Sequence, residues 1–199
     1  MRPGDARRVS AVTRESHAKL MNLFTDNVTQ QYIRRMKYGR DDGREHTNMT
    51  NNFGAPPKSG WAKMVTELHV ADLTTSLAFW RGILDFEVAY QRPEERFVYL
   101  EHAEEHQVML CQRNGRFETG PMAYPLGQGA MFQLFFGSIE PVLRALEIAK
   151  HPIYLGPREV WRRVGEFESG LREVFVQDPD GYLLMLAASI GRRTIAEAG

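Results

Sequence analysis

The sequence feature that most constrains the fold is a pair of apolar runs joined by four turn-forming residues. The runs are 174–177 (Val-Phe-Val-Gln) and 182–186 (Tyr-Leu-Leu-Met-Leu), and Asp-Pro-Asp-Gly at 178–181 separates them. Proline presets a turn dihedral, glycine takes a positive φ at no steric cost, and aspartate side chains accept hydrogen bonds from turn amides. The stretch therefore predicts a tight β-hairpin.

The hairpin belongs to a body, residues 61–190, which contains two copies of a βαβββ pattern, at about 61–125 and 126–190. In the first copy a strand at 64–71 precedes a helix that Asp72 is well placed to cap; in the second, a strand at 130–136 precedes a helix capped by Ser138. The two capping residues are 66 positions apart, which indicates an internal repeat. The remaining expected strands are short: 86–91, 96–101, 107–113, 153–154, 160–164, 171–177 and 182–187.

The two ends of the chain differ from this body. Residues 1–60 are predicted to be an extension, with an amphipathic helix at about 12–36 (apolar residues every four positions) and a Gly-, Pro- and Asn-rich polar linker at 37–60. The helix needs a partner, either the body or a second subunit. An alternative is that Met49 is the true start. Residues 191–199 are predicted to be a C-terminal tail.

Two motifs of the body resemble the vicinal oxygen chelate superfamily, which includes glyoxalase I, extradiol dioxygenases, and fosfomycin and bleomycin resistance proteins. One is the hairpin, and the other is 68–80, with Leu-His-Val-Ala-Asp-Leu followed by Ser-Leu-Ala-Phe-Trp. The resemblance implies an α+β fold in which paired βαβββ modules form a curved mixed sheet around a cleft.

The resemblance also implies where a divalent metal would be held in the metal-binding branches. Their ligands are a His seven residues before the helix cap and a Glu four residues after the turn glycine. Here these positions hold Val65, Met131 and Met185, and the fourth strand at 108–112 offers neither Glu nor His. Divalent ions prefer imidazole and carboxylate ligands. We therefore expect no metal and no cofactor, and we interpret these residues as packing residues or an apolar cleft floor.

Without the metal, the chain is most similar to the bleomycin resistance branch, including its Trp-Arg-Arg-Val-Gly at 161–165. Members of that branch are dimers that sequester a cationic glycopeptide in clefts at the subunit interface. The resemblance therefore implies a binding protein for a bleomycin-like small molecule that acts as a homodimer. Two alternatives stay open: a metal-independent lyase or isomerase on the same fold, and an interaction module that acts through the N-terminal helix.

Five residues are candidates for ligand binding: Glu67, His69, Phe97, Tyr99 and Trp161. Strand alternation places Glu67 and His69 on the face of Val65, where the carboxylate could meet a cation and the imidazole could form a hydrogen bond. In the enzyme alternative the same two side chains are the acid and base. The three aromatic residues offer flat faces to a planar ligand group. The structural alternative is a strand-end histidine and aromatic core packing.

The charge and apolar content of the chain indicate which classes of partner it is expected to bind. Residues 1–40 carry nine basic and three acidic residues, a net +6, so residues 41–199 carry 16 basic and 22 acidic residues, a net −6. An acidic body argues against nucleic acid. Apolar runs stay well short of the ~18 residues that span a bilayer, so no membrane association is expected. Cys111, the only cysteine, is consistent with a cytoplasmic protein, and its apolar strand predicts a buried, inert thiol.

Overall fold

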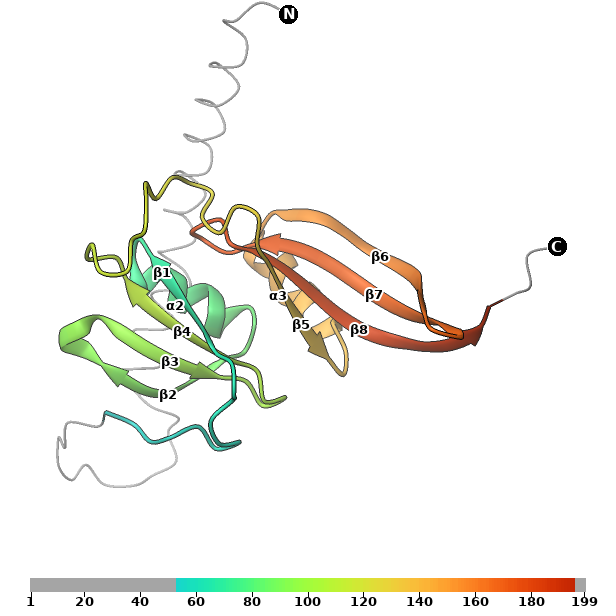
Figure 1. Ribbon diagram of the computed structural model, residues 1–199, viewed down its shortest axis with the longest axis horizontal. Coiled ribbons are helices and arrows are strands. Elements are labelled where there is room, and N and C mark those ends of the chain that lie inside the picture. The colour runs from blue at the N-terminus through green and yellow to red at the C-terminus, as the bar shows by residue number, and fades with distance from the viewer. Residues whose placement is uncertain (1–52, 196–199) are drawn as a thin grey trace, which may run out of the picture. The chain divides into compact units, whose positions relative to one another are not determined.

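The computed structural model describes residues 53–195, and Figure 1 shows their strands and helices. The predicted helix at 12–36 lies outside the described residues. In chain order the elements are β1 (Thr66–Val70), α2 (Leu73–Gly82), β2 (Glu87–Arg92), the 3-10 helix η1 (Pro93–Glu95), β3 (Phe97–Glu101), β4 (Gln107–Gln112), β5 (Met131–Phe136), α3 (Glu140–Ala149), β6 (Ile153–Val164), β7 (Phe167–Gln177) and β8 (Leu183–Thr194). No helix in this part of the chain is long and apolar enough to cross a membrane.

The eight strands form two mixed four-stranded sheets of the same topology. The strand orders are β1-β4-β3-β2 and β5-β8-β7-β6. In each sheet the first and last strands of the module pair in parallel (β1 with β4, β5 with β8), and the other pairs are antiparallel. The predicted repeat of two βαβββ modules is therefore confirmed.

Each helix begins close to its predicted cap. The Asp72 carboxylate accepts a hydrogen bond of 2.7 Å from the Thr75 amide, as predicted. In α3 the N-cap position belongs to Ile139 rather than Ser138, although the Ser138 hydroxyl still accepts a 3.3 Å bond from the Glu140 amide. The proline in the first turn of α3 has a φ suited to a helix, and the helix begins one residue later than a cap at Ser138 would place it.

The second sheet has longer strands than the sequence predicted. One continuous strand, β6, replaces the two short strands expected at 153–154 and 160–164, and β8 runs into the predicted tail. Register shifts before Leu155 and between Leu155 and Arg158, the second spanning Gly156-Pro157, let β6 resume its pairing with β7 beyond the proline. The far end of the sheet is held by cross-strand charge pairs such as Arg193–Glu168, 2.6 Å, so polar residues extend strands that looked like loop.

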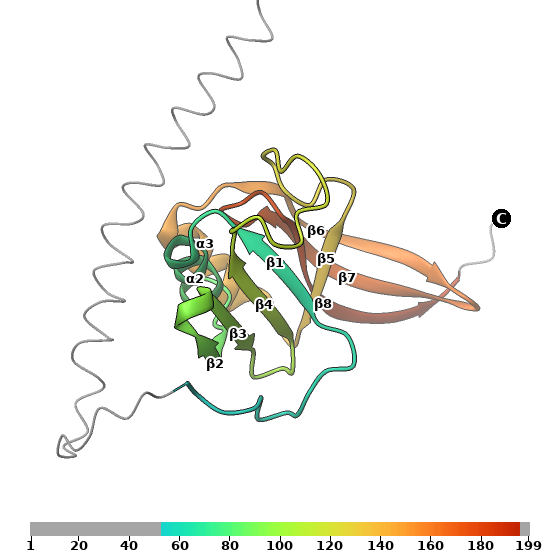
Figure 2. The same ribbon diagram turned by 60° about the vertical axis from the view of Figure 1, so that its left-hand side comes forward.

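The hairpin turn joins the second module to the first. Asp180 accepts hydrogen bonds from the Ala71 amide (2.7 Å) and the Ser76 hydroxyl (3.0 Å), and the Tyr182 hydroxyl donates to the carbonyl of His69 (3.1 Å). An equivalent hydrogen bond runs from the second module to the first. The Gly137 amide, 66 residues after Ala71 and so at the same position of its module, donates to Glu104 between β3 and β4 at 2.7 Å. The ring of Phe79 on α2 also lies 4.9 Å from the ring of His151, two residues after α3. Figure 2 shows α2 and α3 near each other.

Candidate functional site

One face of the first sheet gathers four of the five predicted site residues. On β1, Leu68 and Val70 are buried, while the alternate residues Glu67 and His69 face the other way and are partly exposed. Register places Glu67 beside Met109 and His69 beside Cys111 on β4, which in turn pair with Tyr99 and Phe97 on β3. We call this set the first face; it comprises Val65, Glu67, His69, Tyr90, Phe97, Tyr99, Met109 and Cys111.

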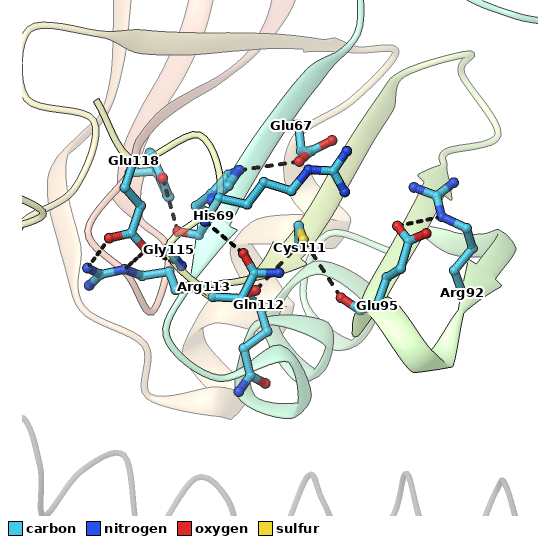
Figure 3. Close-up of polar contacts among 12 residues, drawn as sticks. Glu67, His69, Arg92, Glu95, Cys111, Gln112, Arg113, Gly115 and Glu118 are labelled. Carbon is cyan, nitrogen blue, oxygen red and sulfur yellow. Dashed lines mark hydrogen bonds and ion pairs between the residues drawn. The ribbon is translucent and has the colours of Figure 1, made fainter. Parts of the chain in front are cut away.

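The side chains of Glu67 and His69 contact each other on this face. The Glu67 carboxylate lies 3.3 Å from Nε2 of His69, and Figure 3 shows the two side chains turned toward each other. Nδ1 of His69 is buried and has no hydrogen-bond partner among the described residues. A carboxylate on Nε2 favours the tautomer that carries its proton there, which leaves Nδ1 as an acceptor. The ring edge is covered by Phe117, whose centroid is 6.3 Å away.

Cys111 lies next to this pair but is not an activated thiol. Burial raises the pKa of the Cys111 thiol, and the negative charges of Glu67 and Glu95 raise it further. The sulfur faces the backbone oxygen of Glu95 at 3.9 Å, as Figure 3 shows. A nucleophilic cysteine needs a lowered pKa. The prediction that Cys111 is a buried thiol is confirmed.

Aromatic rings form the other half of the first face. Tyr90 and Tyr99 stack with centroids 5.1 Å apart, and the Arg92 guanidinium lies 3.7 Å from the centre of the Phe97 ring. Phe97 and Tyr99 are 2% exposed, so they are a floor rather than a freely accessible surface. Trp61 stands edge-on to Tyr99 at 5.4 Å and is 61% exposed. The sequence interpretation did not include Trp61, because neither strand nor helix periodicity extends to it.

Residues 53–62, which we call the strap, bind across this aromatic floor. The last eight residues of the predicted linker at 37–60 are among the described residues, and they contact the first sheet. Gly54 forms a β-bridge with Tyr90, and the Lys58 and Ser59 amides each donate to the Glu101 carboxylate at 2.8 Å. Burial acts to raise the pKa of Glu101, but the hydrogen bonds from Ser59 and Lys58 outweigh it and leave this pKa below its ordinary value. The Gln107 side chain also bonds the carbonyl of Gly60, 2.6 Å.

Replacing Glu101 with glutamine should release the strap without unfolding the sheet. The substitution removes the charge that accepts both amides, and charge-assisted bonds of this kind contribute about 1.5–3 kcal/mol. We expect hydrogen exchange at the Lys58 and Ser59 amides to accelerate by at least tenfold while the β3 and β4 amides stay protected. Glu94→Gln, on the exposed neighbouring turn, is the matched control. Unchanged protection of both strap amides would contradict this account.

The fifth predicted site residue, Trp161, lies elsewhere. It is on β6 of the second sheet and pairs with Gly170. A Cβ atom added to Gly170 would lie only 2.8 Å from the Trp161 ring, so the glycine makes room for the indole. The Arg193 guanidinium lies 4.4 Å from the centre of that ring. Neighbouring Arg162 faces the opposite side of the strand, where it binds Glu173. The structure therefore does not bring Trp161 together with Glu67, His69, Phe97 and Tyr99.

The side chains at the metal positions of the resembled family do not fit a divalent ion. Val65 borders the first face, while Met131 and Met185 lie on adjoining strands of the second sheet, two residues out of register. None of these three offers an oxygen or nitrogen ligand. Within residues 53–195 no group of three or more His, Cys, Asp or Glu side chains is arranged to hold a metal.

Comparison with known proteins identifies the family. The model of the Glyoxalase/Bleomycin resistance protein/Dioxygenase superfamily matches residues 62–186. The chain belongs to this superfamily. The vicinal oxygen chelate resemblance seen in the sequence is thus confirmed at the level of the superfamily. A search of curated proteins gave no match.

Several solved structures align with this chain over most of their own length. A superfamily member from Vibrio splendidus shares 34% identity over 62% of this chain and 95% of its own, with a TM-score of 0.27. Lactoylglutathione lyase from Agrobacterium tumefaciens shares 18% identity (67% and 95% covered, TM-score 0.44), and a fosfomycin resistance protein from Listeria monocytogenes shares 18% (64% and 91%, TM-score 0.44).

Proposed function

We propose that this superfamily member is a metal-free small-molecule binding protein of the bleomycin resistance type. In this proposal it sequesters a cationic glycopeptide, or a ligand of similar chemistry, in a cleft between two copies of the chain. The observation that carries the proposal is the first face, where a carboxylate lies beside an aromatic floor. Binding sites commonly combine such a largely apolar surface with a few placed polar groups.

The first face matches the chemistry of a cationic, partly planar ligand. The Glu67 side chain is 29% exposed, so it can approach a ligand cation, while His69 holds it from one side at 3.3 Å. The exposed ring of Trp61, which stands edge-on to Tyr90 and Tyr99, suits a heteroaromatic group. Cations bind well over such rings, which adds to the attraction of the carboxylate.

The dimer in this proposal is supported by the second sheet. Met131 and Phe135 on β5 are 46% and 50% exposed, and their side chains share a face with Met185 and Ala187. Met185 and Ala187 are already buried, whereas Met131 and Phe135 remain open to solvent. A second copy would cover them and complete the curved sheet around a cleft.

Phe135→Glu should therefore convert the dimer to a monomer. A charge placed in an apolar interface has no partner there and must be desolvated, so association becomes unfavourable. Sedimentation velocity of the full chain should show the loss, and Ile148→Glu, at an exposed position of α3, should leave the dimer intact. A wild-type chain that is monomeric at high micromolar concentration would overturn the dimer.

The test of binding is a calorimetric titration of metal-free bleomycin into EDTA-treated protein. We expect saturable binding near one ligand per chain with micromolar affinity or better. Glu67→Gln should weaken it by about tenfold or more, since a charged hydrogen bond contributes roughly 1.5–3 kcal/mol. Glu94→Gln is the control, an exposed acid away from the first face. Absence of heat together with an unchanged melting temperature would overturn the bleomycin assignment.

The second candidate function is a metal-independent lyase or isomerase. The observation that favours it is the Glu67–His69 pair, because a carboxylate in contact with an imidazole can pass a proton to and from a substrate, and the Glu67 side chain is 29% exposed. Turnover of an α-keto or epoxide substrate that is lost in both Glu67→Gln and His69→Asn would support it. Turnover that persists in both variants would exclude this pair as the catalytic groups.

A further inference from the structure

A cluster of two arginines and one glutamate interrupts the apolar face of the second sheet. Glu173 on β7 is fully buried. Its carboxylate receives Arg158 Nε at 2.9 Å, and Arg162 donates through Nη1 at 2.8 Å and Nη2 at 2.9 Å. Both arginines are on β6, four residues apart and therefore on one face, and each side chain is 44% exposed.

The cluster presents only hydrogen-bond donors to solvent. Arg162, and then Arg158, hold the pKa of Glu173 below its ordinary value, so this carboxylate is charged at neutral pH. Both of its oxygens are already occupied by guanidinium groups. Two cations and one anion leave a net charge of +1, carried by half-exposed guanidinium groups whose outer N–H donors face outward. Glu173 thus fixes two like charges side by side, which would otherwise repel each other.

The surroundings of the cluster are apolar. The Arg158 guanidinium lies 5.5 Å from the centre of the Phe175 ring, and Met185, Ala187 and Leu171 pack around that ring. A buried ion cluster rarely stabilises a fold better than apolar side chains of the same volume. Stability alone therefore does not explain why three charged residues lie on this apolar face of the second sheet. Ligand-binding sites, in contrast, typically combine apolar walls with fixed polar groups.

We propose that Arg158 and Arg162, held in place by Glu173, form an anion-binding site for the carboxylate or phosphate group of a small molecule with an apolar body. The paired guanidinium groups offer the planar, forked donors that match either anion. The apolar body lies against Leu171, which is partly exposed where it packs on the buried Phe175 and Met185. Because Glu173 preorganises both arginines, little side-chain entropy is lost on binding. The site is on the second sheet and does not rest on the proposed function of the first face.

The test uses the full chain and three probes that share a phenyl ring: phenyl phosphate, phenylacetate and the neutral benzyl alcohol. NMR titration should show saturable binding of one or both anions, with shifts centred on the Arg158, Arg162 and Phe175 signals, and at least tenfold weaker binding of benzyl alcohol. Preference between the two anions distinguishes a phosphate ligand from a carboxylate ligand. Equal binding of all three probes would overturn the site, because the arginines would then contribute nothing.

Variants locate the site on the cluster. Arg162→Gln and Arg158→Gln each leave one arginine on Glu173, so both should fold, and each should weaken anion binding by at least tenfold. The matched control is Arg163→Gln, next along the same strand but on its opposite face, where the side chain bonds the carbonyl of Gly165. If one variant fails to fold, the other decides the question. Anion binding that survives both substitutions, or that falls equally in Arg163→Gln, would contradict the proposal.

Discussion

Replacing Asp178 with asparagine should make the protein more stable at about pH 8 and leave its stability near pH 4 unchanged. Burial of Asp178, reinforced by the charge of Asp180, raises the pKa of Asp178 from its ordinary 3.8 to about 7. Between these two values the folded state holds a proton that the unfolded chain has released. The free energy of unfolding of the wild type therefore falls as pH rises through this window.

The expected size of this effect follows from the pKa. The rise in the pKa of Asp178 from 3.8 to about 7 means that the variant can gain at most about 4 kcal/mol in its free energy of unfolding. Asparagine keeps the acceptor that bonds the Asp180 and Tyr182 amides, but it loses the long 3.4 Å bond from the Trp80 indole. We therefore expect a gain of roughly 2 kcal/mol at about pH 8, with almost none below pH ~4.

Urea unfolding of the wild type and Asp178→Asn at several pH values measures this difference. Asp85→Asn is the control, because Asp85 is exposed and asparagine tolerates its φ of 59°. A difference between Asp178→Asn and the wild type that does not grow with pH would show that Asp178 is not the group responsible.

Replacing both Arg158 and Arg162 with methionine should destabilise the protein strongly at neutral pH. Glu173 then remains fully buried without either of its partners, and such an unpaired buried charge costs about 3–5 kcal/mol. Because the guanidinium groups are half exposed, water can reach the carboxylate, so we expect about 3 kcal/mol. A single Arg162→Met change should cost less, since Arg158 stays in place.

The pH dependence of this loss identifies its cause. In the wild type the pKa of Glu173 is lowered, so its contribution is present at neutral pH and is lost on acidification. In the double variant burial favours the protonated acid, so lowering the pH should restore stability relative to the wild type. Arg163→Met should change the free energy of unfolding by less than about 0.5 kcal/mol at any pH. A loss in the double variant that is independent of pH would indicate a packing defect instead.

Patterns among residues close together in the sequence predict most of the turns, caps and strands of the fold. The hairpin turn was predicted from its own residues, and Gly181 indeed has a φ of 90°. Asp72 was recognised as a cap because a cap bonds an amide three residues away. The length of β6, β7 and β8 was missed, because pairs such as Arg193–Glu168 join residues 25 positions apart and look like loop residues in sequence.

The candidate site was predictable only where alternation along one strand decided it. Glu67 and His69 share a face because they are two residues apart, and register then brought Phe97 and Tyr99 beneath the strap. Trp161 lies apart from the other four predicted site residues because its strand belongs to the second sheet. The cluster around Glu173 depends on a pairing between β6 and β7, and its only trace in the sequence is a glutamate next to an apolar run.

The strap also changes where the folded unit begins. β2 is the outer strand of its sheet, and without residues 53–55 its backbone groups would face solvent along one side. An open strand edge is a template on which other chains assemble. A shortened protein that starts at Trp61, where the strand pattern suggests the domain starts, would expose both this edge and the tyrosines beside it. The smallest piece of the chain suited to crystallisation or display therefore includes Phe53.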